Sequence, residues 1–511
     1  MKIQLLRNSL STLLKVVLST ILGLFLPPLI ITRMGLDAFG IWGLILLINV
    51  YTVFLDLGLE SSLIKHIADA YTDNDLERIN GFFSIAMTVY AIIFCFGLLI
   101  AFYGSRFITL LLIRSTDALQ YQLIVQLYIV VAFGNLLVIP LASTLKGLQL
   151  YDRSNFIEIL AAFINALGSI TGLVFGWGIM SLLFGVALAM FWRLGVYTYF
   201  VRKNLRTLKW RKISTNNLKL LRDLFSLSPA DISVRIYSVA TQSVIRFALV
   251  TYGGLVAVGA YEIAKRVVGQ ISGMSTTIFT PLLPTVSVLT RQDRQQTLLQ
   301  LLERSLLYLS IASMPILVFM LLHYDAILQA WLGVEDVQMI ALAGRLLLLA
   351  TCIDLFTGPV TTAAVGMGTA RITILKLAGP LILYVTLIPL FGYLYGFTGI
   401  LVGETVALIV GTLIGLYVFK SWTSIPVLSM AFKYIVQVCL SAIPFALVIW
   451  FLWKSSSLWW GWQNLLVWGS VFTGYLLVTA VIFRITGILS SYEINLVAAL
   501  FQRSTNRANP L

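Results

Sequence analysis

The sequence predicts an all-α integral membrane protein of about fourteen transmembrane helices, in two six-helix halves and two extra C-terminal helices. Three observations predict it. Hydrophobic residues make up 59% of the 511 residues and charged residues only 11%, where a soluble domain carries about 25% charged residues. Apolar runs of membrane-spanning length follow one another along the chain, and a glycine motif recurs at a fixed distance. This composition excludes a water-soluble globular enzyme, a disordered chain and a coiled coil.

Each expected span is an apolar run of about 20 residues or more. The N-terminal run extends to Ile31, which is too long for a cleaved signal, so it is interpreted as the first span. The eighth run contains Pro281 and Pro284, which predict a break near its end. The fourteen expected spans are 10–32, 39–64, 81–103, 120–145, 156–175, 179–201, 226–250, 255–289, 300–323, 339–364, 372–391, 397–419, 431–453 and 464–484.

The distribution of Lys and Arg predicts the orientation of these spans. With the N-terminus inside, 25 of the 35 basic residues fall on the cytoplasmic side and six lie deeper within spans. The 25 include five at the cytoplasmic ends of spans, namely Lys15, Arg304, Lys376, Lys433 and Arg484. The four on the outer side are Arg33, Arg106, Arg114 and Lys454. Basic residues favour the cytoplasmic side of membranes, so both termini are expected in the cytoplasm. The net charge of +14 then needs no nucleic-acid partner.

No catalytic or cofactor motif is found in the sequence. The three cysteines, Cys95, Cys352 and Cys439, lie singly in apolar runs, and the two histidines, His66 and His323, lie far apart. This pattern indicates neither disulfides nor a metal site. Phosphate-binding and dinucleotide-binding glycine motifs are also absent from the sequence. We therefore expect no cofactor, no metal, no enzymatic activity and no direct use of ATP.

The chain repeats itself with an offset of 219 residues. The segment 35–42 (GLDAFGIW) aligns with 254–261 (GLVAVGAY), and the same offset places Pro140 on Pro359 and Gly147 on Gly366. Gly178 and Gly185 fall on Gly396 and Gly403 at an offset of 218. Six spans separate the copies, so both copies have the same orientation. Such parallel repeats are related by a pseudo-two-fold axis along the membrane normal, with a binding site expected between them.

The repeat sets the expected domain boundaries. Residues 1–201 form the first half, 202–222 a basic cytoplasmic linker, 223–420 the second half, and 421–511 two additional helices and a cytoplasmic tail. The linker (RKNLRTLKWRKISTNNLKLLR) is either a topology anchor beside anionic lipid or a contact for a partner enzyme.

These features resemble a known superfamily. Two six-helix halves, the glycine turn after the first span of each, and the segment 56–59 (DLGL) on span two are similar to the multidrug/oligosaccharidyl-lipid/polysaccharide exporters. Within it, the chain most resembles the polysaccharide transporter branch, the O-antigen (Wzx-type) flippases, over roughly residues 1–420. The resemblance implies translocation of undecaprenyl-diphosphate-linked oligosaccharide across the bacterial inner membrane by alternating access, for the biosynthesis of O-antigen, capsule or exopolysaccharide.

Span seven carries the clearest polar stripe. Asp231, Arg235, Gln242 and Arg246 lie on one helical face because they are spaced by four, seven and four residues. Arg235 has a possible ion-pair partner one turn away in Asp231, whereas Arg246 has no acid at that spacing. Because an ionisable group within the membrane is costly, it is expected to face a cavity or a partner. Arg246 is therefore expected to be available to an anion.

Span eight carries a second stripe. Glu262 and Arg266 are four residues apart, and Lys265 projects from an adjacent face. Two readings remain open for both stripes: ion pairs within each helix, or a cationic site for a diphosphate. The expected substrate-binding residues are Arg235, Arg246, Lys265, Arg266 and, on span ten, Arg345.

The first half carries acidic residues instead. Asp56 and Glu60 lie one helical turn apart on span two. A buried carboxylate can carry a proton, so both residues are candidates for ion coupling. The alternatives for Asp56 are a salt bridge to a cation on the facing half or exposure to a cytoplasmic vestibule. Asp354 and Glu404 are weaker candidates of the same kind.

The expected function is thus a flippase whose partners are lipid-linked oligosaccharide and membrane lipids, with a polysaccharide polymerase and glycosyltransferases as further candidate partners. Within the same superfamily, a lipid II flippase and a cation-coupled drug exporter remain alternatives. A membrane polysaccharide polymerase or glycosyltransferase is an alternative of another class, and it would need a large loop with catalytic acids or a metal site.

Overall fold

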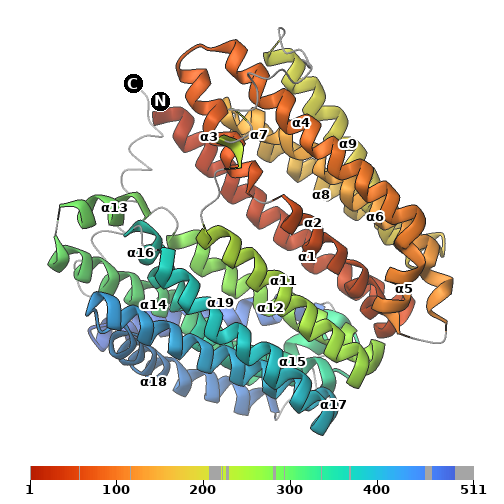
Figure 1. Ribbon diagram of the computed structural model, residues 1–511. Helices are drawn as coiled ribbons and strands as arrows, with labels where there is room; N and C mark the ends of the chain where they lie inside the picture. The colour runs from red at the N-terminus through yellow and green to blue at the C-terminus, as the bar shows by residue number, and fades with distance from the viewer. Residues whose placement is uncertain are drawn as a thin grey trace, which may run out of the picture. The chain divides into compact units, whose positions relative to one another are not determined.

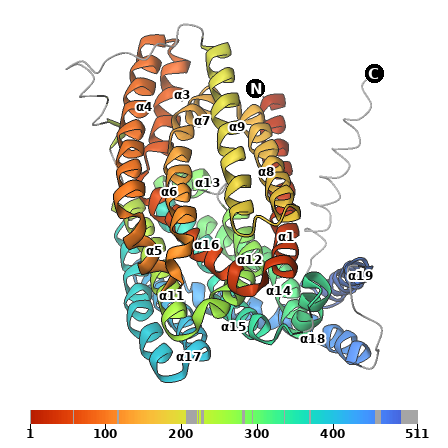
Figure 2. The ribbon, with the colours of Figure 1, turned by 90° about the vertical axis from the view of Figure 1, so that its right-hand side faces the viewer.

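The described residues of the computed structural model form helices almost throughout (Figures 1 and 2). The helices meet the first expectation of an all-α chain, and no strand occurs within the described ranges. Most of the predicted linker 202–222 lies outside the residues that the structure describes. The structure describes residues 2–56, 58–114, 117–205, 220, 223–225, 229–279, 283–292, 294–334, 336–367, 370–454 and 463–488.

The chain divides into two compact units, which are described separately. The first comprises residues 1–267 and 373–407, and the second comprises 268–372 and 408–511. The predicted boundaries of the two halves, at residues 201, 223 and 420, stay predictions.

Most helices of the first unit come from the N-terminal part of the chain. They are α1 (Lys2–Ile45), α2 (Leu47–Leu55), α3 (Leu59–Thr72), α4 (Leu76–Leu99), the π-helical turn η1 (Ile100–Gly104), α5 (Ser105–Ile113), the 3₁₀ turn η2 (Ala118–Tyr121), α6 (Gln122–Leu136), α7 (Val138–Gly147), α8 (Tyr151–Val174), α9 (Met180–Asn204), α11 (Pro229–Tyr252), α12 (Gly254–Phe279) as far as Val267, and residues 373–407 of α17 (Ala370–Thr423).

The second unit holds the remaining parts of α12 and α17 and the other helices. These are α13 (Leu283–Arg291), α14 (Gln295–Leu332), α15 (Gln338–Asp354), α16 (Thr357–Gly366), α18 (Val427–Lys454) and α19 (Gln463–Ile485). Within this unit α14 packs against α18 and α19. The aromatic side chains of Phe319, Trp468 and Tyr475 form the core of that contact.

Nine helices of the described residues are long and apolar enough to cross a membrane, or ten if α15 and α16 form one bent span. α1 and α17 each contain a non-helical glycine, Gly35 and Gly396, at which two helices join. α11 and α12, which carry the polar stripes, are not among the nine. Each of the fourteen predicted spans overlaps a helix, but the number of crossings stays a prediction.

The predicted repeat is visible in the bounds of the helices. The offset of 219 residues carries the segment Leu76–Ile113 onto α14 and α7 onto α16. α7 and α16 each begin shortly before a proline, Pro140 and Pro359. A proline ring clashes with the carbonyl four residues earlier. The preceding helices, α6 and α15, end four and five residues before these prolines, at Leu136 and Asp354.

The two copies of the glycine motif contact each other within the first unit. Gly35 and Gly254 have φ angles of +84° and +79°, which favour glycine. A Cβ atom on Gly40 would collide with the carbonyl oxygen of Leu255, and one on Gly259 would collide with that of Leu36. Each motif therefore supplies a glycine that leaves room for a backbone carbonyl of the other motif.

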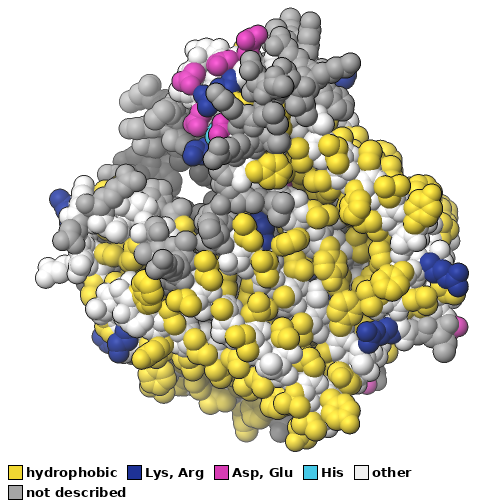
Figure 3. All heavy atoms as spheres, viewed as in Figure 1, with side chains coloured by type: hydrophobic (Ala, Val, Ile, Leu, Met, Phe, Trp, Pro, Cys, Tyr) yellow, Lys and Arg dark blue, Asp and Glu magenta, His cyan; other side chains and the backbone are white. Residues whose placement is uncertain are grey.

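Apolar side chains cover much of the surface (Figure 3). In the first unit, Tyr103 and Phe107 are 85% and 69% exposed. An aqueous surface rarely carries so much contiguous apolar area, whereas lipid tails accommodate it. The exposed apolar surface agrees with the membrane location that the composition predicts.

Candidate functional site

A cavity of about 560 Å³ lies between the α2–α3 segment and α11, within the first unit. Its wall combines aliphatic side chains with amide, hydroxyl and guanidinium groups, as is usual for a ligand site. The lining residues are Asn49, Val50, Val53, Phe54, Gly58 and Ser61 on one side and Val234, Arg235, Ser238, Val239 and Gln242 on the other.

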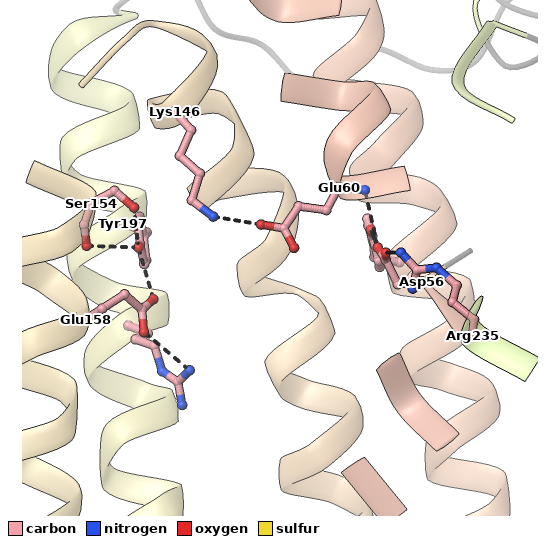
Figure 4. Close-up of polar contacts among 9 residues, drawn as sticks. Asp56, Glu60, Lys146, Ser154, Glu158, Tyr197 and Arg235 are labelled. Atoms are coloured by element: carbon pink, nitrogen blue, oxygen red, sulfur yellow. Dashed lines mark hydrogen bonds and ion pairs between the residues drawn. The ribbon is translucent and has the colours of Figure 1, made fainter. Parts of the chain in front are cut away.

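Asp56 lies at the break between α2 and α3 and is only 5% exposed. Its Oδ2 accepts a hydrogen bond from the backbone N–H of Gly58 at 3.1 Å. Its Oδ1 accepts from the backbone N–H of Glu60 at 3.3 Å and from the hydroxyl of Tyr90. Gly58 has a left-handed φ of +76°, which lets the chain turn so that Asp56 caps α3 (Figure 4).

Arg235 of α11 completes the environment of Asp56. Its Nη2 lies 3.2 Å from Asp56 Oδ2, and its Nη1 donates to the carbonyl oxygen of Val53 at 2.8 Å. The alternative of a salt bridge to a cation on the facing half is thus correct for Asp56. The expected partner within α11, Asp231, has a side chain outside the described residues. A quarter of the Arg235 side chain stays exposed, on the wall of the cavity.

Glu60 forms a separate ion pair with Lys146 of α7, with 2.7 Å between Oε1 and Nζ (Figure 4). The two side chains are 41% and 25% exposed, so this pair is accessible to solvent. The coupling roles of Asp56 and Glu60 stay predictions.

The expectation that Arg246 lacks an acidic partner is wrong. Its Nε lies 2.7 Å from Oε1 of Glu262 on α12, and both side chains are largely buried. Its Nη1 also donates to the side-chain oxygen of Gln242 at 3.2 Å. The acid comes from a neighbouring helix, whereas the sequence argument considered only acids within the same helix.

The reading in which Arg266 pairs with Glu262 within α12 is not met, because Glu262 lies against Arg246 of α11 instead. Arg266 instead donates from Nη1 to the backbone oxygen of Gly23 at 3.0 Å and lies over the ring of Phe39. Both groups belong to α1. Arg266 therefore holds α12 against α1, and its availability to a diphosphate stays a prediction.

Lys265 belongs to a chain of hydrogen bonds that ends at Glu404. Its Nζ donates to the hydroxyl of Tyr261 at 3.0 Å, and that hydroxyl donates to Oε1 of Glu404 on α17 at 2.7 Å. Glu404 is 3% exposed and belongs to the part of α17 that lies in the first unit. Two carboxylates and three basic side chains of α11, α12 and α17 thus lie within the first unit. They are Glu262, Glu404, Arg246, Lys265 and Arg266.

Comparison with known families finds one match over more than half of the chain. Residues 5–290 match the family described as polysaccharide biosynthesis protein. The chain belongs to this family. It is a multi-pass membrane protein of the multidrug/oligosaccharidyl-lipid/polysaccharide exporter superfamily. No curated protein matches the chain.

Solved structures share the fold of this transporter at low sequence identity. One is titled lipid II flippase MurJ in an inward closed conformation, with 15% identity, a TM-score of 0.66, and coverage of 96% of this chain and 99% of that chain. Another is an inward-facing multidrug resistance MATE family transporter, with 14% identity, a TM-score of 0.60 and coverage of 80% and 95%. A mutant of the Vibrio cholerae MATE transporter VcmN has 15% identity, a TM-score of 0.55 and coverage of 82% and 96%.

Arg345 belongs to the second unit of the transporter. It pairs with Asp325 of α14 at 2.5 Å, and the two side chains are 43% and 39% exposed. Asp354, a weaker coupling candidate, accepts from the hydroxyls of Thr357 and Thr412. No group of three or more His, Cys, Asp or Glu side chains in the described part of the chain could hold a metal ion.

Sequence reasoning missed Tyr90, Asn49 and Tyr261. The hydroxyl of Tyr90 donates to Asp56, but the two residues are 34 positions apart in the sequence, and no spacing rule predicts a contact at that separation. Asn49 donates to the hydroxyl of Tyr128 at 2.5 Å beside the cavity. Tyr261 could have been found, because it lies four residues before Lys265 and aligns with Trp42 in the repeat.

Proposed function

We propose that this transporter is a flippase that moves undecaprenyl-diphosphate-linked oligosaccharide across the bacterial inner membrane by alternating access. The family match supports a role in polysaccharide biosynthesis. A lipid-linked cargo needs a polar route for its sugars and phosphates, while its lipid tail stays in the bilayer. Both termini are proposed to face the cytoplasm, in agreement with the distribution of basic residues.

The observation that carries the proposal is the position of Arg235 on the wall of the polar cavity. Its hydrogen bonds to Val53 and Asp56 use Nη1 and Nη2, and its exposed quarter leaves room for an anion to approach. A guanidinium forms strong, planar contacts with phosphate oxygens. The amide and hydroxyl groups of Asn49, Ser238 and Gln242 line the same cavity and suit sugar hydroxyls.

Reconstitution into liposomes tests the proposal. A fluorescent undecaprenyl-diphosphate-linked oligosaccharide is placed in the inner leaflet, and its arrival in the outer leaflet is measured by quenching with an impermeant reagent. We expect flipping by the wild-type protein and about ten-fold slower flipping by Arg235→Ala, because one charge-assisted contact is worth roughly 1.5–3 kcal/mol. Arg235→Lys, which keeps the charge but loses the planar fork, should be intermediate.

Three comparisons separate the alternatives. Faster flipping of lipid II than of the oligosaccharide would favour a lipid II flippase, and accumulation of the cation ethidium would favour a drug exporter. Elongation of the oligosaccharide during the assay would favour a polymerase or glycosyltransferase. Absence of flipping with a panel of defined lipid-linked sugars would reject the proposal.

A further inference from the structure

Glu404 combines deep burial with an incompletely satisfied carboxyl group. It is 3% exposed, and Oε1 accepts the hydroxyl hydrogen of Tyr261, whereas Oε2 has no hydrogen-bond partner among the described residues. A buried oxygen without a partner is costly, and more so on a charged group. Glu262 Oε1 also accepts no hydrogen bond, but it lies 2.7 Å from Nε of Arg246, and Asp56 Oδ2 lies 3.2 Å from Nη2 of Arg235, so each of those carboxylates faces an arginine.

Two basic side chains lie near Glu404, and the hydroxyl of Tyr261 connects one of them, Lys265, to its carboxylate. Tyr261, Glu262 and Lys265 approach from α12, Arg246 from α11, and Tyr384 from the first segment of α17. Lys265 contacts Glu404 only through Tyr261, with successive distances of 3.0 Å and 2.7 Å. Glu262 already neutralises Arg246 at 2.7 Å. Glu404 and Lys265 are thus the two charged groups of this cluster whose connection is indirect.

We infer that Lys265, Tyr261 and Glu404 form a proton-binding site, and that Glu404 takes up and releases the proton that drives the transporter. The inference rests on the proposed transport function and adds the identity of the coupling ion. A metal cation would need several oxygen ligands, but this cluster offers one open carboxylate oxygen beside Lys265 and Arg246. A proton needs only one carboxylate oxygen, and Oε1 already accepts the hydroxyl hydrogen of Tyr261.

The hydrogen bonds define a balanced transfer. Tyr261 gives its hydroxyl proton to Glu404 Oε1 while it receives one from the Lys265 ammonium group, so Tyr261 stays neutral. Lys265 becomes an amine and Glu404 a carboxylic acid, and the total charge of the three residues is unchanged. Uptake of a proton from water by the Lys265 amine then restores the ammonium group. The net result is one proton bound by the site.

The site lies beside two backbone features that can respond to its charge. Glu404 follows the kink at Gly396 in α17, and Tyr261 follows Gly259, which packs against Leu36. Protonation of Glu404 removes its attraction to Lys265. Attraction between the kinked segment of α17 and α12 therefore changes with proton occupancy, which is the requirement for coupling to a conformational cycle.

Infrared difference spectroscopy of the purified protein tests the site without any cargo. We expect a carboxylic-acid C=O stretching band that appears as the pH is lowered and is absent from Glu404→Gln. The double variant Arg246→Gln with Glu262→Gln is the matched control, since it removes a nearby carboxylate together with its buried partner and should leave the band in place. A titrating band that persists in Glu404→Gln, or no titrating band in the wild type, would overturn the inference.

Flipping of the fluorescent undecaprenyl-diphosphate-linked oligosaccharide under an imposed proton gradient tests the coupling. The gradient should accelerate wild-type flipping but not flipping by Glu404→Gln. Because that variant leaves Lys265 unpaired, the double variant Lys265→Met with Glu404→Gln serves as a folded substitute. Restored, gradient-driven flipping in the double variant would reduce the pair to a structural role. Failure of the wild type to flip any cargo would reject the proposed function, whereas the infrared result would still decide the proton site.

Discussion

Asp56 and Arg235 form an ion pair across 179 residues of sequence, with 3.2 Å between Oδ2 and Nη2. The pair connects the break between α2 and α3 to α11. Asp56 also caps α3, so one carboxylate satisfies two backbone N–H groups and neutralises a guanidinium. This arrangement makes Asp56 a structural centre of the cavity wall.

Asp56→Ala should lower the free energy of unfolding by about 2 kcal/mol, because charge-assisted hydrogen bonds and a helix cap are lost together. Unfolding of the purified protein in increasing concentrations of denaturing detergent measures it. Tyr90→Phe removes one neutral donor, keeps the ion pair and should cost about 1 kcal/mol. Equal stability of Asp56→Ala and the wild type would contradict the assignment.

Arg246→Ala should reduce the amount of folded protein in the membrane, because it leaves Glu262 buried without its cation. The double variant Arg246→Gln with Glu262→Gln should recover much of that loss, since no uncompensated charge remains. Fluorescence-detected size-exclusion chromatography of both variants provides the measurement. Normal levels for Arg246→Ala would instead indicate that another group neutralises Glu262.

Gly40→Ala and Gly259→Ala should each strongly destabilise the protein, because the added methyl group would collide with a backbone carbonyl. Gly23→Ala is the control, since a Cβ atom there meets nothing within 4 Å, and alanine favours a helix by up to about 1 kcal/mol over glycine. Thermal stability in detergent should fall for the first two variants only. A similar rise in thermal stability at all three positions would show that helix propensity, not the contact, decides.

A cysteine at position 216, introduced as Asn216→Cys in a protein without its three native cysteines, should be protected from an impermeant thiol reagent in intact cells. The reason is the excess of basic residues on that side of the membrane. Ser115→Cys, in an expected outer loop, should react under the same conditions. Labelling at position 216 but not at position 115 would invert the proposed topology.

The sequence was sufficient to predict the helical membrane fold and the repeat. Apolar runs give helices directly, and Pro140 and Pro359 break them at equivalent places because the proline ring acts within its own helix. The contact between Gly40 and the Gly254 motif was not predicted, although both motifs were found. A motif identifies residues that need close backbone approach, but it does not say which other segment approaches.

The charged residues show the limit of single-helix reasoning. Arg246 lacks an acid within its own helix and was expected to bind an anion, but Glu262 approaches from α12. Asp56 was correctly given a cationic partner as one alternative, and the structure identifies it as Arg235. Spacing rules evaluate neighbours at three or four residues, whereas these pairs depend on how separate helices pack.

The reciprocal contact between the glycine motifs also constrains how the chain is made. Gly40 cannot complete its packing until Leu255 has been synthesised, more than 200 residues later. During that interval the surface around Gly40 must be covered by lipid or by the insertion machinery, because contacts so distant in sequence form late. An arrest of translation between the two motifs should therefore leave a membrane-inserted N-terminal segment without its final packing, which is an expected target for quality-control proteases.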